Sequence, residues 1–351
     1  MLHTTKRKTK NKIYHDYRCQ QICKKLNRYS KEKSTIFYKT NGPHRLTLHA
    51  PTRLNIFDAT EEALKFFAEV SSAILKCGVH SFLYFDLSQV ESITPDAIMY
   101  LIAIIKNTKR IRTLGITCQG NMPINKDARA LFQEVGFYKF VSSSCRYNVA
   151  ENKKYMKIQN GILADSVLAG NFCDFTNTNN GETFIYTKSL YTMIVELMTN
   201  THQHAYQDNS ENKIKWAMYY NWYIYAQNVE GEIQFIFLDT GIGIPNTVSK
   251  RRREKLKDSF GRVKESVYLQ SALTGDYART ETGLPHRGKG LPGIYEDCKK
   301  GAIQNLKIIS GQAKCVVGPD GSVISEDMAS SFRGTLFTWK LTNKGGNYDC
   351  N

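Results

Sequence analysis

Asp239-Thr240-Gly241-Ile242-Gly243-Ile244-Pro245 directly follows a short apolar run, residues 232–238, whose composition predicts a β-strand. A turn signal at residues 229–231 precedes that run. Asp239 is therefore expected at the carboxyl end of a strand, where its carboxylate can accept a hydrogen bond from an exocyclic amine. Gly241 and Gly243 allow the backbone to approach a flat ligand closely. The alternative for this stretch alone is a strand that ends in an ordinary glycine turn.

A predicted helix over residues 188–206 comes before this strand, because apolar residues recur there at three- and four-residue steps. Glu196, Asn200 and His204 are spaced four residues apart, so they share one helical face. A carboxylate, an amide and an imidazole in one row can serve a hydrated magnesium ion and a phosphate chain. Magnesium takes few protein oxygens and fills its shell with phosphate oxygens and water. A solvated polar stripe is the simpler interpretation of this helix alone.

A third stretch, residues 287–293, contains the string G-x-G-x-x-G at Gly288, Gly290 and Gly293. A dinucleotide-binding fold would place this string after an early strand, whereas here it follows a long polar loop. We expect a helix over residues 293–300. Backbone N–H groups at a glycine loop and a helix start suit phosphate, and Arg287 and Lys289 add positive charge.

In their order and spacing these stretches resemble the N, G1 and G2 boxes of the gyrase, chaperone, histidine kinase and mismatch-repair ATPase superfamily (GHKL). Residues 334–339, Gly-Thr-Leu-Phe-Thr-Trp, resemble the final G-T-x-F strand of that superfamily. The resemblance covers about half of the chain. It implies that residues 161–342 form a Bergerat-type α/β sandwich that binds ATP.

The resemblance also implies a role for each position. The catalytic residue would be Glu196, which would orient or deprotonate the attacking group, and Asn200 would ligate Mg²⁺. Asp239 would read the adenine amine, and Thr335 would support the adenine end through its hydroxyl. The other ATP-binding positions would be His204, Gly241, Gly243, Arg287, Gly288, Lys289, Gly290 and Gly293. ATP and Mg²⁺ are therefore the expected cofactors.

Residues 43–142 are predicted to form a separate α/β domain with a mostly parallel sheet, because strands and helices alternate there. The expected strands are 45–50, 81–87 and 113–118, and the expected helices are 61–77, 95–106 and 126–135. The unit resembles a STAS domain at residues 85–90, in the helix after Pro95, and at residues 130–137.

The STAS resemblance departs from the family pattern at the phosphoacceptor, which is usually D-S-S-G or D-S-T-G. This chain has Thr94-Pro95-Asp96-Ala97 at that place. The usual serine is missing, which puts switching by phosphorylation here in doubt. Thr94 could take its role, but helix capping explains a threonine there equally well.

The remaining segments are predicted to be a basic leader (1–42), a polar linker (143–160), a long polar stretch (244–286) and a tail (343–351). The polar stretch is long enough to act as a functional lid. Net charge is +16, which favours an acidic partner, and the leader could bind nucleic acid or be a solvated tail. The chain has 9 scattered cysteines and neither a signal peptide nor an apolar run of membrane length. We therefore expect a cytoplasmic protein that binds ATP, has a protein partner or self-associates, and does not contact a membrane.

Three functions are compatible with this pocket. The first is an ATP-hydrolysing regulatory switch coupled to the STAS-like domain. The second is a protein serine/threonine kinase of the anti-sigma-factor type, because those kinases use only the minimal pocket domain and act on STAS proteins. The third is a module that holds nucleotide without turnover. The sequence does not identify the trigger or the oligomeric state.

Overall fold

The computed structural model describes residues 45–108, 111, 114–137, 154–180, 186–205, 221–247, 263–276 and 290–341. The leader, the tail, and the predicted phosphate-binding residues Arg287, Gly288 and Lys289 lie outside these residues. Within them the fold is mixed α/β, with parallel sheets in the first part of the chain and an antiparallel sheet in the second. The coarse fold class predicted from the sequence is therefore confirmed.

The first part contains a parallel three-stranded sheet in the order β1-β3-β5. A second parallel pair joins the two-residue strands β2 and β4. Helices α2, α3 and α5 alternate with the strands, as predicted, and Gly136 ends the α5 region with a φ of 84°. The elements are β1 (Arg45–His49), β2 (Arg53–Leu54), α2 (Thr60–Lys76), β3 (Phe82–Asp86), β4 (Ser92–Ile93), α3 (Pro95–Asn107), β5 (Thr117–Gly120) and α5 (Lys126–Glu134).

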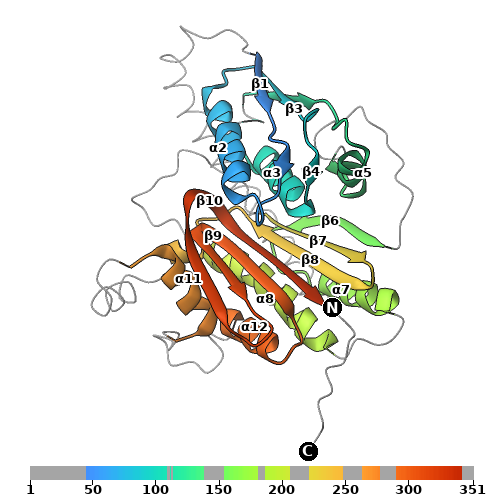
Figure 1. Cartoon of the computed structure of the whole chain (residues 1–351), viewed down its shortest axis with the longest axis vertical. Coiled ribbons are helices and arrows are strands. Elements are labelled where there is room, and N and C mark those ends of the chain that lie inside the picture. Colours follow the sequence, from blue (N-terminus) through green and yellow to red (C-terminus); the bar gives the residue numbers. More distant parts are fainter. Residues whose placement is uncertain are drawn as a thin grey trace, which may run out of the picture.

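The second part contains a five-stranded antiparallel sheet in the order β6-β7-β8-β10-β9. Four of its helices, α7, α8, α11 and α12, cover one face of this sheet, and Figure 1 shows them behind and below the strands. The elements are β6 (Tyr155–Gly161), α7 (Ser166–Asn180), α8 (Thr187–His204), β7 (Trp222–Val229), β8 (Glu232–Asp239), α9 (Ile244–Thr247), α11 (Glu265–Thr274), α12 (Gly290–Lys299), β9 (Gln304–Val317) and β10 (Val323–Leu341).

Several predicted elements differ from the structure. Residues 155–160 of the predicted linker belong to β6, which pairs with β7. Residues 166–180 form helix α7. Strands β9 and β10 form one long hairpin, and in its turn the Gly321 N–H donates to the Gly318 carbonyl at 3.0 Å. Within the polar stretch 244–286, α9 and α11 pack against β9.

The first part of the chain packs on the sheet face that the four helices leave uncovered (Figure 1). One continuous apolar cluster joins α2, α3 and the three-stranded sheet to the strands below. The sheet contributes Tyr223, Tyr225, Ile236, Leu238, Ile309, Met328, Phe332 and Leu336 to it. Helix α3 lies inside this cluster, and its residues 96–105 are all buried. A helix that is apolar on every side is expected at such a buried position.

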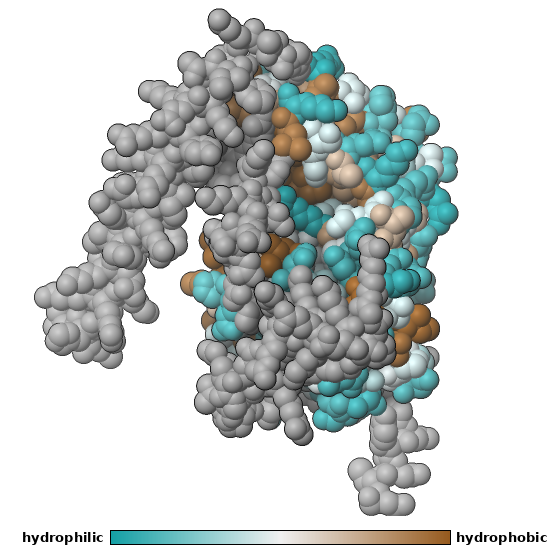
Figure 2. Space-filling view, turned by 90° about the vertical axis from the view of Figure 1, so that its left-hand side faces the viewer, coloured by the Kyte–Doolittle hydropathy of each residue, from teal (hydrophilic) through white to brown (hydrophobic). Residues whose placement is uncertain are grey.

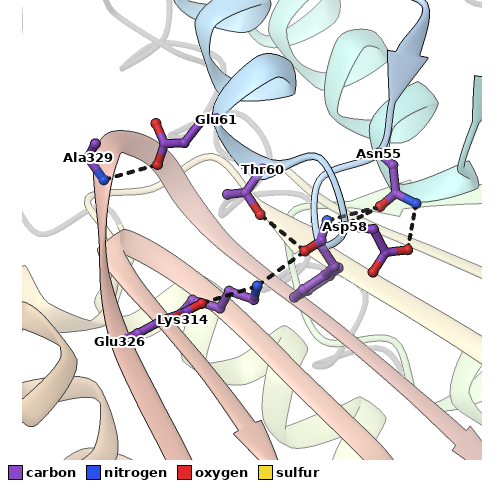
Figure 3. Close-up of polar contacts among 8 residues, drawn as sticks. Asn55, Asp58, Thr60, Glu61, Lys314, Glu326 and Ala329 are labelled. Carbon is purple, nitrogen blue, oxygen red and sulfur yellow. Dashed lines mark hydrogen bonds and ion pairs between the residues drawn. The ribbon is translucent and has the colours of Figure 1, made fainter.

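Polar contacts stabilise the same interface in the part of the β9–β10 hairpin that extends past the end of β8 (Figure 3). Lys314 Nζ donates to the Phe57 carbonyl at 3.2 Å and pairs with Glu326 at 3.2 Å. A Glu61 carboxylate oxygen accepts the Ala329 N–H at 3.0 Å. On the side that Figure 2 shows, hydrophobic residues of the described part form small groups among hydrophilic ones. The large apolar faces are therefore buried between the two parts of the chain.

No helix in the described part of the chain is long and apolar enough to cross a lipid bilayer.

Candidate functional site

The end of α8, residues 239–245 and Thr335 of β10 meet at the end of the antiparallel sheet where β8 stops. Of the third stretch, residues 290–293 are described, and Gly290 lies beside Glu196 on α8. Strand alternation sends Asp239 to the helix-covered face, together with Phe235 and Phe237. The register then places Asp239 opposite Thr335 of β10, and Thr335 opposite Ser310 of β9. A row of buried polar side chains therefore crosses three neighbouring strands at this end of the sheet.

Asp239 is the titratable group of this row. Burial raises the pKa of its carboxyl to about 6, opposed by hydrogen bonds from the Gly241 N–H and from the hydroxyl and N–H of Thr335. The Gly241 N–H lies 2.8 Å from Asp239 Oδ1. Among the described residues no cation pairs with this carboxylate. Its two oxygens can accept more hydrogen bonds than they receive here, so the group suits an amine donor from a ligand.

Ser310 belongs to the site although the sequence analysis did not select it. Its hydroxyl accepts the Ile244 N–H at 2.8 Å, donates to the Gly334 carbonyl at 3.1 Å and lies 3.0 Å from Thr335 Oγ1. In the sequence, Ser310 is marked only as a polar residue between the apolar pair 308–309 and Gly311. That signal becomes informative only when the register of β9 against β10 is known.

Gly243 closes the second stretch over the same row. Its φ of 83° is a backbone conformation that glycine adopts without strain. A side-chain carbon at this position would lie 3.0 Å from Ser310 Oγ and 3.3 Å from the Gly334 carbonyl oxygen. Only a residue without a side chain lets the backbone pass this close to β9 and β10.

The end of α8 contacts the second stretch directly. The Ile242 N–H donates to the Ala205 carbonyl at 2.8 Å. A side-chain carbon at Gly241 would overlap with the same carbonyl, so the missing side chain permits this contact. The side chain of His204 lies outside the described residues, so its predicted contact with phosphate stays a prediction.

Glu196 and Asn200 lie on α8, and both are half-buried. The Glu196 carboxylate occupies the space that a side chain on Gly290 would fill. Gly290 is the first residue of α12, so the last part of the glycine string begins a helix beside this carboxylate. Gly293 lies within α12, where a side-chain carbon would meet no atom within 4 Å. The helix therefore starts three residues earlier than predicted.

The residues present fit a magnesium–ATP site in their donor chemistry. An amide and a carboxylate share one half-buried helical face, and a helix N-terminus lies next to them. The described residues contain no group of three or more His, Cys, Asp or Glu side chains that could hold a metal ion. Such a set is not what magnesium requires when phosphate oxygens and water complete its shell. Asn200 and Glu196 are the residues that would face it.

Residues 94–97, which stand where the STAS resemblance would place a phosphoacceptor, are largely buried. Thr94 stands at the N-cap of α3 as predicted, but its hydroxyl makes no cap hydrogen bond. Neither Thr94 Oγ1 nor Asp96 Oδ2 is exposed or has a hydrogen bond of ordinary geometry. Burial raises the pKa of Asp96 to about 6, and the neighbouring Thr94 hydroxyl opposes this. Thr94 cannot receive a phosphate in this conformation, because its oxygen is covered.

Comparison with known proteins finds no match to a family model and no match among the curated proteins. The site is therefore interpreted from its own residues and geometry.

Proposed function

We propose that the chain binds magnesium–ATP in a GHKL-type pocket and transfers the terminal phosphate to water as a regulatory switch. One observation carries this proposal: the end of α8, the residues after β8 and Thr335 of β10 meet at one end of the sheet, and Glu196 of the same helix lies beside the start of α12. The pocket belongs to a Bergerat-type sandwich, and the first part of the chain is STAS-like, in this proposal.

Each part of the proposed site has a separate task. Asp239, when ionised, accepts a hydrogen bond from the adenine amine, and Gly243 lets the base lie against the backbone. The N–H groups at the α12 start face the phosphates. Asn200 would hold magnesium, which when bound neutralises charge on the phosphates. Glu196, one helical turn from Asn200, orients the attacking water and takes its proton.

The experiment uses full-length protein, magnesium, and ATP labelled on the terminal phosphate. Glu196→Gln should keep its affinity for ATP and lose at least about a hundredfold in phosphate release, the range expected for removal of a general base. Glu232→Gln is the matched control, because Glu232 begins the same strand that Asp239 ends and pairs with Lys340 at 2.6 Å. It should leave both quantities unchanged.

Three results separate the alternatives. Free phosphate that disappears in Glu196→Gln supports the switch. Label on a protein added from a lysate would replace the switch with a kinase, and the covered Thr94 hydroxyl already argues against phosphorylation within the chain at that place. Bound ATP with neither product would leave a nucleotide-holding module, and equal turnover in wild type and Glu196→Gln would remove Glu196 as the base.

A further inference from the structure

Asn107 links the first part of the chain to the end of β8. It is the last residue of α3 and is fully buried. Its Nδ2 donates to Thr240 Oγ1 at 2.9 Å, and its Oδ1 accepts the Tyr223 hydroxyl at 2.7 Å. Asn221 Nδ2 also donates to this oxygen at 3.3 Å. One amide thus holds the end of β8 and the beginning of β7 together from behind the sheet.

Thr240 directly follows the carboxylate that would read the base. Side chains alternate along the strand, so Asp239 faces the helices and Thr240 faces the first part of the chain. Thr240 is buried at 2% exposure, so its hydroxyl depends on a protein partner. If Thr240 loses that partner and shifts, the neighbouring peptide and the Asp239 carboxylate move with it.

A second contact on the same face of α3 holds the opposite strand. Tyr100 precedes Asn107 by seven residues, about two helical turns, so both point to the sheet. The Tyr100 hydroxyl accepts the Arg333 N–H at 3.1 Å and donates to the Arg333 carbonyl at 3.2 Å. Its ring stacks on Phe332 at a centroid distance of 4.2 Å. This contact fixes the backbone two residues before Thr335.

The polar character of position 107 is not required by packing. The other buried positions of α3 that touch the cluster are almost all apolar, and an apolar side chain would fill this space as well. A buried amide costs free energy unless its hydrogen bonds are made, and it then selects one alignment of the groups around it. Here the groups that it aligns are the ends of β7 and β8.

We propose that Asn107 is a positioning residue for base recognition: through Thr240 it holds Asp239 at the place where the adenine amine is read. The inference rests on the proposed function and adds to it that part of the base specificity is set by α3, outside the ATP-binding sheet and helices. Removal of Asn107 therefore reduces the discrimination between adenine and other bases more than it reduces binding of the phosphate chain.

The test compares the affinities of ATP and ITP, because ITP carries an oxygen in place of the exocyclic amine and keeps the same phosphates. Asn107→Leu keeps the branched shape of the side chain and removes both the donor and the acceptor of the amide. It should lower the preference for ATP over ITP about tenfold and change ITP affinity little. Thr240→Val, which removes only the hydroxyl and keeps the shape, should give the same loss of preference if Asn107→Leu does not fold.

Lys314→Met is the control for loosening of the interface. It removes the contacts of Lys314 with Phe57 and Glu326, in the part of the hairpin that extends past the end of β8, and should leave the ATP-to-ITP ratio unchanged. An unchanged ratio in both Asn107→Leu and Thr240→Val overturns the inference while the proposed function stands. A wild-type protein that binds no ATP, or binds ATP and ITP equally, instead overturns the proposed reading of the base by Asp239, and the inference with it.

Discussion

Asp239 makes a quantitative prediction, because its buried carboxyl must lose its proton before it can accept an amine. Burial raises its pKa from 3.8 to about 6. A rise of this size corresponds to about 3 kcal/mol between the protonated and ionised forms. The protonated form is favoured in the folded protein, so this contribution to stability is fully present below pH 3.8 and is lost as pH rises through about 6.

Asp239→Asn removes the titration and keeps the shape of the side chain. Between pH 4 and pH 8 the free energy of unfolding of the variant should therefore rise by about 2.4 kcal/mol relative to wild type. Asp96 has a similarly raised pKa of about 6, but its contribution is the same in both proteins and cancels in the difference. Urea unfolding at several pH values measures this difference directly. A difference that does not change with pH would refute the assignment of a buried, proton-binding Asp239.

The same titration should control nucleotide binding. At pH 5 about one tenth of a group with a pKa near 6 is ionised, so ATP should bind about tenfold more weakly at pH 5 than at pH 7. ITP measured in parallel corrects for protonation of the phosphates, which both nucleotides share. Asp239→Asn should abolish ATP binding, whereas Asp96→Asn, which removes an equally buried carboxyl in the other part of the chain, should leave it intact. ATP affinity unchanged in Asp239→Asn would remove the pocket assignment.

Two further predictions concern residues around the pocket. Gly290→Ala places a carbon where the Glu196 carboxylate lies and should lower phosphate release at least about tenfold with little loss of stability, because a side chain can move aside. Gly170→Ala, in open space on α7, is the control and should be as active as wild type. Equal activities of the two variants would contradict the placement of Glu196. Ser310→Ala should cost about 1–3 kcal/mol of stability, since the Ile244 N–H loses its acceptor, and should weaken ATP binding. Ser325→Ala, which removes a hydroxyl that donates to Gln270 at 2.7 Å elsewhere in the hairpin, should leave ATP binding unchanged, and calorimetric titration of both serine variants measures the contrast.

The sequence predicts an element well where its own pattern is strong. The apolar period of α8 and the apolar run of β8 lie within one or two residues of their predicted ends. Helix α7 was missed because its last residues, Asn177-Thr178-Asn179-Asn180, have low helix propensity. Packing stabilises this helix instead, because buried Phe172 lies against residues on the helix-covered face of the sheet, such as Phe235. Strand β6 was missed because the apolar residues among 155–161 are few and do not alternate regularly, and the strand's edge position is set by pairing with β7.

The residues of the candidate site also differ in how far the sequence reveals them. Asp239 and Gly243 stand out in the sequence because they follow an apolar run, and Thr335 because residues 334–339 resemble the final GHKL strand. Ser310 and Asn107 do not stand out, because their contacts depend on strand register and on residues more than 100 positions apart. Local patterns can therefore suggest candidate site residues, but not the residues that hold them in place.

The packing of α3 gives the proposed switch a physical route. This helix is buried between the parallel three-stranded sheet and the antiparallel five-stranded sheet, so neither part can move without repacking it. Its two polar side chains toward the antiparallel sheet, Tyr100 and Asn107, contact the strands that carry Thr335 and Asp239. If nucleotide binding draws these strand ends together, the change must pass to α3 and then to the parallel sheet. By reciprocity, a partner that binds the first part of the chain and shifts α3 would change nucleotide affinity by the same factor.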